Sequence, residues 1–275
     1  MINALRSELF LTRKRRVVYI MGLLWILMVT MFAFGIPYLV AMSLPEQDAA
    51  TLLQLVSLEM YPQTSVSSYP MFGAATFLIL GAIIGGSDWN WGTWKGLLTN
   101  GPSRWAVVLA KAAAAALAAT VITIAAQVVA LPVSYAMSSV AGLGTTLPPW
   151  GSIAASLGAA ILIAVASCSV GLALAILTRS LSLSLSIGLL WVLAFESIVS
   201  GLVQLWPPLV FVQKLLLGPA SGSLAAALGA TELANGGTPG VVAAMSVPVA
   251  ITVLLAYTAV AVSASGFVMS RRDIA

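Results

Sequence analysis

The chain has 275 residues, of which 60% are hydrophobic and 7% are charged, and its formal net charge is +4. Soluble domains carry about 25% charged residues, so this chain lacks the polar surface that water requires, and lipid is its expected solvent. Histidine is absent and the single cysteine, Cys168, lies in an apolar run, which excludes histidine-based zinc sites, Ser-His relays and a disulfide framework.

The acidic residues give no sign of a catalytic or metal site. There are eight of them, most stand alone, and no GxxxxGK[ST] phosphate-binding loop occurs in the chain. We therefore expect no catalytic residues, no metal ligands and no cofactor bound by this chain.

The first residues, 1–16, combine apolar positions at helical spacing, Ile2, Leu5 and Leu9, with a cluster of bases. This pattern predicts a short amphipathic helix in the membrane interface, and a solvated basic tail is the alternative. The apolar run that follows, residues 17–41, is longer than the hydrophobic part of a signal peptide. It is long enough to cross about 30 Å of hydrocarbon.

Six apolar runs are long enough to cross a bilayer: residues 17–41, 70–86, 106–137, 151–177, 183–205 and 241–269. They predict an all-α integral membrane protein whose residues 1–275 form a single transmembrane domain. Residues 206–240 are a large loop, and its two apolar pieces, 209–217 and 223–228, are interpreted as re-entrant or interfacial because they are too short to span. Gly81 and Gly85 form a GxxxG pair, which favours close helix packing or arises by chance in a glycine-rich chain.

The distribution of basic residues predicts the orientation. Six spans place both termini on one side of the membrane, and every lysine and arginine except Lys214 falls on that side. Cytoplasmic loops carry an excess of such residues, so both termini are expected in the cytoplasm.

The longest internal polar stretch, residues 87–105, lies between the second and third spans and reads SDWNWGTWKGLLTNGPSRW. Trp91, Trp94, Leu97 and Leu98 share one face of a helix, and Asp88 is placed to cap that helix or favour its positive end. The pattern predicts a short helix along the cytoplasmic membrane surface. A passive interfacial connector is the alternative.

This stretch resembles the cytoplasmic loop in permease subunits of ABC exporters of the ABC-2 type. In that family an acid precedes Gly-Thr, a Leu-Leu-Thr-like run, Ser-Arg and an early lysine in the next span. The matching residues here are Asp88, Gly92, Thr93, Leu97, Leu98, Thr99, Ser103, Arg104 and Lys111. The closing residues 271–274 and the six-span plan also resemble the family. Asp88 stands where Glu is commoner, and the tryptophans are unusually dense.

The resemblance implies that residues 87–104 form a coupling helix that docks on a separate ATP-hydrolysing subunit. The docking residues would be Asp88, Trp91, Gly92, Thr93, Lys95, Thr99, Ser103 and Arg104. It further implies two ABC ATPases that bind ATP and Mg²⁺, a second permease copy or a sister permease, and a bacterial plasma membrane. The apolar spans favour a hydrophobic or amphipathic cargo such as a drug, peptide or lipid-like molecule, and no nucleic-acid partner is expected.

One acid lies inside a span. Glu196, Ser200 and Gln204 recur every four residues and form a polar stripe on the outer half of the fifth span. Because a charge near the bilayer centre costs about 2.5–3.5 kcal/mol, Glu196 is expected to face protein, water or a partner. It is either a substrate-facing or cation-recognising position, or a structural group in interhelical hydrogen bonds or at a permease dimer interface.

Three other classes of protein remain as alternatives. A membrane enzyme lacks support because its nucleophile, base or metal cluster is missing. A secondary transporter or channel subunit usually has paired broken helices and several intramembrane polar groups. A non-transporting membrane sensor that uses the same ATPase partner has the same sequence features as the exporter subunit.

Overall fold

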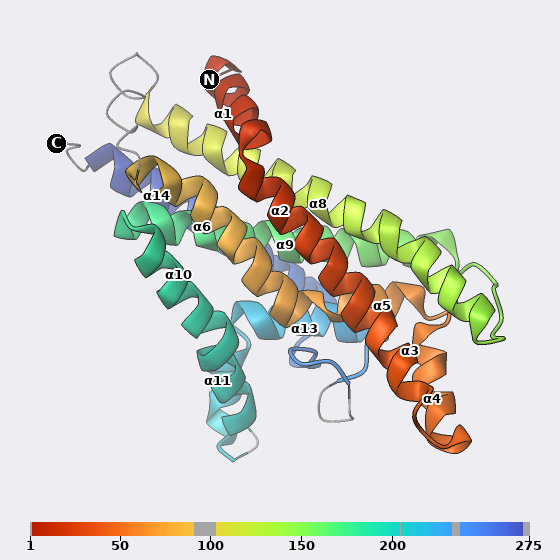
Figure 1. Cartoon of the computed structure of the whole chain (residues 1–275). Coiled ribbons are helices and arrows are strands. Elements are labelled where there is room, and N and C mark those ends of the chain that lie inside the picture. Colours follow the sequence, from red (N-terminus) through yellow and green to blue (C-terminus); the bar gives the residue numbers. More distant parts are fainter. Residues whose placement is uncertain (1, 91–102, 204, 233–236, 272–275) are drawn as a thin grey trace.

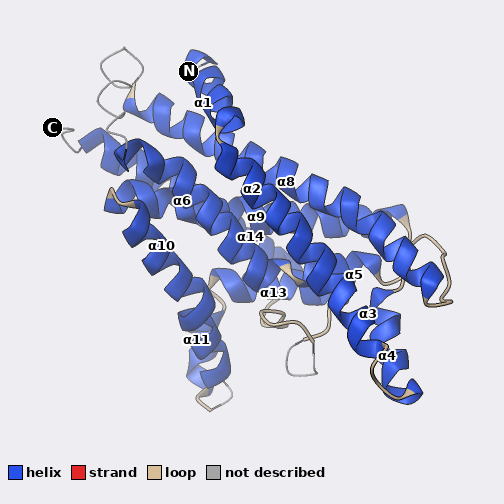
Figure 2. Cartoon of the chain, viewed as in Figure 1, coloured by secondary structure: helices blue, strands red, loops and turns tan. Residues whose placement is uncertain are grey.

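The computed structural model describes residues 2–90, 103–203, 205–232 and 237–271 (Figure 1). Within these residues the chain forms helices and loops without a β-strand (Figure 2). Six helical stretches are long and apolar enough to cross a membrane, or seven if a bent helix pair is counted as one span, so the described residues have the predicted all-α fold with six candidate spans. They cover Arg16–Ala41, Tyr61–Trp89, Arg104–Val140, Trp150–Thr178, Leu181–Leu202 and Val247–Arg271.

The second span begins at Tyr61, nine residues before the predicted start at residue 70. Its first part, helix α5 (Tyr61–Ser67), is rich in serine and threonine and lies before the predicted span. The hydroxyl groups of Ser65 and Ser67 donate to the carbonyls of Pro62 and Thr64, at 3.2 and 2.8 Å. Because the hydroxyls are satisfied within the helix, this polar segment is buried without exposing unpaired groups.

Three of the spans contain a π-helical segment. The first span consists of α2 (Arg16–Met28), η1 (Val29–Gly35) and α3 (Ile36–Ala41). In the second, η2 (Tyr69–Gly73) separates α5 from α6 (Ala74–Asn90), and in the fifth, η3 (Leu190–Phe195) separates α10 (Leu181–Leu189) from α11 (Glu196–Leu202). The other spans are the uninterrupted helices α8 (Arg104–Val140), α9 (Trp150–Thr178) and α14 (Val247–Arg271).

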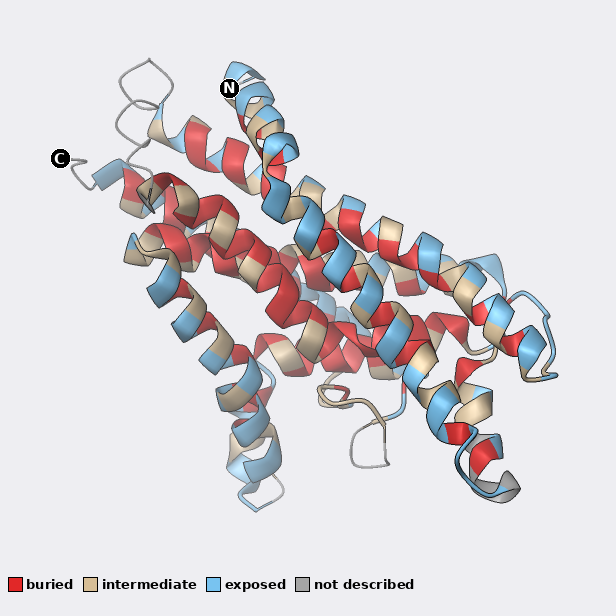
Figure 3. Cartoon of the chain, in the orientation of Figure 1, coloured by how far each residue is buried: buried red, intermediate tan, exposed pale blue. Residues whose placement is uncertain are grey.

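Helices α6 and α9 form the centre of the bundle (Figure 3). In the second and fourth spans 67% of the residues in an 18-residue apolar stretch are buried, against 17–22% in the first, fifth and sixth spans. The two central helices approach backbone to backbone, since Gly81 faces the carbonyl of Cys168 and Gly171 faces the carbonyl of Leu78. The GxxxG pair therefore does promote close packing, with α9 as its partner.

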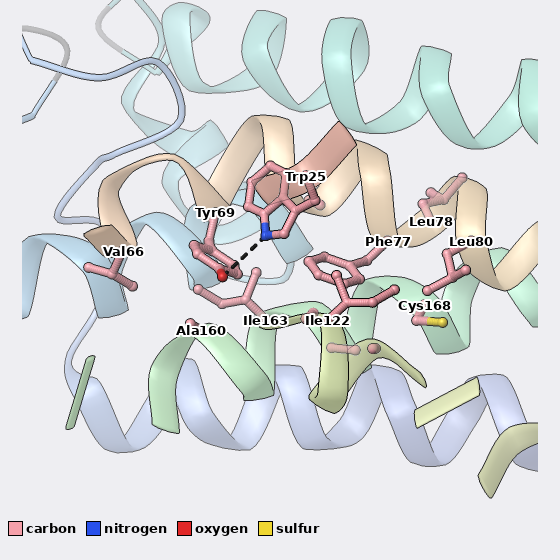
Figure 4. Close-up of a cluster of buried hydrophobic side chains, with 14 of the residues drawn as sticks. Trp25, Val66, Tyr69, Phe77, Leu78, Leu80, Ile122, Ala160, Ile163 and Cys168 are labelled. Carbon is pink, nitrogen blue, oxygen red and sulfur yellow. Dashed lines mark hydrogen bonds between the residues drawn. The ribbon is translucent and has the colours of Figure 1, made fainter. Parts of the chain in front are cut away.

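An aromatic cluster fills the core between the first, second and third spans (Figure 4). The indole Nε1 of Trp25 donates to the hydroxyl of Tyr69 at 3.2 Å. The rings of Trp25 and Phe77 meet edge to face with centroids 5.6 Å apart. Edge-to-face contacts of this kind add stabilisation beyond the burial of apolar area, so the cluster fixes α2 against α6.

One end of the bundle contains the start of α2, the end of α6, the start of α8 and the end of α14. Arg15 pairs with Asp88, and the guanidinium of Arg104 donates to the carbonyl of Met269 at 3.1 Å. We call this the terminal end, because α1 and the end of α14 lie there (Figure 1). The opposite end, with the end of α8 and the start of α9, is the distal end. The placement of the terminal end in the cytoplasm stays a prediction.

The predicted N-terminal helix is present as α1 (Ile2–Lys14). Its buried residues are Glu8 and Thr12, whereas Ile2 is exposed. The helix packs against α8. Polar residues take the face toward α8 because Lys111 offers a buried charge there, and the placement of the apolar residues in the membrane interface stays a prediction.

The large loop before the sixth span contains short helices: η4 (Pro207–Leu209), α12 (Val210–Gln213) and α13 (Leu217–Ala227). The first two and α13 are bent by 90° relative to each other, as in a broken span or a re-entrant loop. Helix α13 is almost entirely buried and packs against α14, α5, α9 and η2. Helix α4 (Glu46–Val56) lies near the distal end and contacts α3 and α8.

Candidate functional site

Four charged side chains from four parts of the chain meet inside the terminal end. The ammonium group of Lys111 on α8 pairs with Glu8 Oε1 on α1 at 2.8 Å and with Asp88 Oδ2 at the end of α6. The other oxygen of Asp88 lies 3.1 Å from the guanidinium of Arg15, which joins α1 to α2. Two acids and two bases compensate each other, so the cluster has no net charge.

The cluster determines the surroundings of its two central members. Lys111 has 0% exposed surface, and its charge is compensated by Glu8 and Asp88. Asp88 lies in the last turn of α6, where the helix dipole favours a cation, and Lys111 and Arg15 stabilise its carboxylate there. Its predicted cap on the stretch that follows stays a prediction, because that stretch lies outside the described residues.

The residues on either side of 91–102 are anchored to different helices. On one side, Asp88 is in the charge cluster and the ring of Trp89 lies 5.3 Å from the guanidinium of Arg179. On the other, Ser103 caps α8 by accepting from the amide of Ala106 at 3.2 Å, and Arg104 binds the end of α14. Both ends of the segment are therefore held at the terminal end.

The coupling-helix prediction, residues 87–104, differs from the structure at both edges. Residues 87–90 are the last turn of α6, and Arg104 begins α8. Among the predicted docking residues, the structure describes Asp88, Ser103 and Arg104. The others lie outside the described residues: Trp91, Gly92, Thr93, Lys95 and Thr99.

The intramembrane acid Glu196 binds the start of α13. Its Oε1 accepts from the indole of Trp191 at 2.9 Å and from the amide of Leu217 at 3.1 Å, and its Oε2 accepts from the amide of Gly218 at 2.7 Å. Leu217 and Gly218 are the first residues of α13, whose amides have no partner within the helix. Glu196 thus caps α13 from another helix, which is an interhelical hydrogen-bonding role.

A partly enclosed cavity of about 340 Å³ lies beside this cap. Glu196 and Ser200 of the predicted polar stripe both line it, and Gln204 lies outside the described residues. Glu232, Met71 and Val241 are also in its wall. The volume falls in the range of small-molecule sites, which is about 300–1,000 Å³.

Several of these groups were not identified from the sequence. The sequence pattern places Glu8 and Arg15 only in the basic, amphipathic segment of residues 1–16. Lys111 was the one sequence signal of a buried charge cluster. It lies seven residues beyond the start of α8 at Arg104, roughly 10 Å along the helix, which is too deep for a charge at a helix end. Gly218 and Trp191 gave none, because their role depends on how α13 packs.

The arrangement offers a compensated charge cluster at one end and a carboxylate-lined cavity toward the other. The described residues contain no group of three or more His, Cys, Asp or Glu side chains that could hold a metal ion. The fold defines a multi-pass, all-α membrane protein.

The chain belongs to the DUF2705 family, because the family model described as "Protein of unknown function (DUF2705)" matches residues 16–275. A search of curated proteins found no match to this chain.

Proposed function

We propose that this chain is the membrane-spanning permease subunit of an ATP-driven exporter of the ABC-2 type. It moves a hydrophobic or amphipathic molecule out of the cytoplasm or the inner leaflet. A separate ATPase subunit docks on residues 87–104, and two permease chains act with two ATPases. The sequence resemblance at these residues is the starting point of the proposal.

The observation that supports it best is the anchoring of both flanks of residues 91–102. Asp88 connects the segment to α1, α2 and α8 through ion pairs with Lys111 and Arg15. Arg104 connects it to the end of α14 through the carbonyl of Met269. A force applied to the segment by a docked ATPase is therefore passed to four helices at once, because packed and ion-paired elements move together.

The participation of a second permease chain follows from the family resemblance. Most residues of the first, fifth and sixth spans are not buried within the chain, so these spans offer surface that a second chain or lipid covers.

Co-expression of this chain with an ABC ATPase subunit tests the proposal. The tagged chain is purified in nanodiscs, co-purified ATPase is quantified, and ATP turnover and vesicle export are measured for wild type and for Asp88→Asn. The substitution removes the charge that links α6 to Lys111 and Arg15. We expect the complex to persist while substrate-stimulated turnover falls about tenfold, equivalent to about 1.4 kcal/mol of lost coupling.

The matched control is Glu59→Gln, an exposed acid at the distal end, which should leave turnover unchanged. Absence of any ATPase in the purified complex contradicts the exporter assignment. Full coupling in Asp88→Asn contradicts the role of the charge cluster in coupling. ATPase binding without export indicates instead the membrane sensor that uses the same partner.

A further inference from the structure

The cavity beside Glu196 is lined by both apolar and acidic groups. Pro70 and Met71 of η2 and Val192 of η3 supply apolar wall, and the acids are Glu196 and Glu232. The cavity lies where η2, α11, α13 and the segment before α14 come together. A cavity of about 340 Å³ accommodates a small organic molecule or the end of a longer one.

Among the described residues, the acids of this cavity have no compensating base. Glu196 is 3% exposed, and its hydrogen bonds come from uncharged donors, one indole and two backbone amides. Glu232 accepts from the amide of Ala243 at 3.3 Å. In the described part of the chain no lysine or arginine forms an ion pair with either acid. At the terminal end, by contrast, each buried acid pairs with a base.

We infer that this cavity binds the cationic head of an amphipathic molecule, with Glu196 as the principal counter-charge and Glu232 as a second one. Where the cavity is the substrate site, this inference names the substrate class and rests on the proposed export function. Binding itself does not depend on an ATPase.

The geometry leaves room for such a head group. An ionised carboxylate offers about four acceptor positions, and three of those on Glu196 are filled, which leaves one on Oε2. The hydroxyl of Ser200, four residues further along α11, also lines the cavity and has no hydrogen-bond partner among the described residues. A cation with N–H groups therefore finds a charge, an open acceptor and a hydroxyl, while apolar walls receive its hydrocarbon part.

A charge-matched pair of probes tests the inference. Octylguanidinium and octylurea have the same shape and chain length, and differ in charge. Binding of each to the purified chain in phosphatidylcholine nanodiscs is measured by calorimetry, with empty nanodiscs as the blank. We expect saturable binding of one octylguanidinium per chain, about tenfold or more tighter than octylurea, because the attraction acts at low dielectric.

Two acid variants and one steric variant locate the site. Glu196→Gln should abolish the preference for the cation, and Glu232→Gln, which is partly exposed, should reduce it by a smaller factor. Ser200→Leu fills the cavity without disturbing the cap on α13 and should weaken both probes. Glu59→Gln, outside the cavity, should change nothing.

Equal affinity for the two probes overturns the inference, as does an unchanged preference in folded Glu196→Gln. If Glu196→Gln does not fold, unchanged binding in both Ser200→Leu and Glu232→Gln overturns it instead. Cation binding that persists in a chain found to have no ATPase partner refutes the exporter assignment and leaves the binding site in place. Absence of cation binding in a chain that still couples to an ATPase refutes the cation site and leaves the exporter assignment in place.

Discussion

At the scale of single residues, the ammonium of Lys111 is fully buried and carries a high cost of desolvation. Moving such a charge out of water costs several kcal/mol, and Glu8 and Asp88 offset that cost because they lie in direct contact with it. Asp88 in turn is shared with Arg15. The four side chains therefore act as one unit, in which removal of one member leaves another without compensation.

Replacement of Lys111 by methionine should destabilise the protein by about 3–5 kcal/mol, because two buried carboxylates then lose their common partner. Thermal denaturation of the detergent-solubilised protein, followed by circular dichroism, measures the effect. Lys14→Met is the control, since Lys14 is exposed on α1 and its loss should change stability by less than about 0.5 kcal/mol. Equal melting of the two variants would contradict the role of the cluster.

Gly218 determines whether Glu196 can reach the start of α13. A Cβ atom at this position would collide with Glu196 Oε2. Gly218→Ala should therefore break the cap and destabilise the protein by about 1–3 kcal/mol, the cost of leaving buried polar groups unpaired.

The comparison is Gly201→Ala in the wall of the same cavity, where an added Cβ meets nothing within 4 Å. This change should be neutral or stabilising by up to about 1 kcal/mol, because alanine favours the helix. Denaturation midpoints of the two variants give the answer, and a stable Gly218→Ala protein would show that the cap is dispensable.

At the scale of elements, the π-helical segments lie beside the cavities. Residues of η2 and η3 line the cavity next to Glu196, and residues of η1 and η2 line a second cavity of about 100 Å³. A π turn inserts an extra residue into an α-helix and shifts the side chains that follow, and such turns are frequent at functional sites. The central contact of α6 with α9 contains α-helix throughout and instead uses glycine for close approach.

Two glycines of α9 provide a matched test of this close approach. Gly171 faces the carbonyl of Leu78, and a Cβ there would collide with it, whereas one at Gly158 meets nothing within 4 Å. Gly171→Ala should destabilise the bundle by about 1–3 kcal/mol through overpacking. Gly158→Ala should be neutral or stabilising. Similar unfolding temperatures for the two variants would argue against backbone contact between α6 and α9.

At the scale of the whole molecule, the helix ends that the charge pattern predicts on one side of the membrane lie together at the terminal end of the bundle. The terminal end contains Arg15, Arg104 and Lys111, and the distal end contains the exposed loop between α8 and α9. The excess of bases predicts that the terminal end faces the cytoplasm.

Single cysteines in a Cys168→Ala background test this orientation. Lys14→Cys lies at the terminal end, and Leu147→Cys lies in the exposed loop at the distal end. A membrane-impermeant maleimide should label position 147 in right-side-out vesicles and position 14 in inverted ones. The reverse pattern would show that the terminal end lies outside. Solubilised protein, in which both cysteines should react, is the control for accessibility.

The sequence by itself predicted six candidate spans and the placement of both termini on one side. Both follow from local properties, because hydrocarbon thickness sets the length of an apolar helix and basic residues mark one side of the membrane. The hydrophobic pattern was less informative at residues 61–67, where the hydroxyls of Ser65 and Ser67 are satisfied inside a polar helix.

The tertiary structure alone decided the partners of the polar groups. Lys111 on α8 pairs with Glu8 on α1, and Glu196 accepts from the amide of Leu217, 21 residues further along the chain. Such contacts depend on the register in which distant helices pack, and hydropathy, spacing and charge counts contain little information about that register. The sequence therefore predicted that Glu196 faces protein, water or a partner, and the packing of α13 decided which groups surround it.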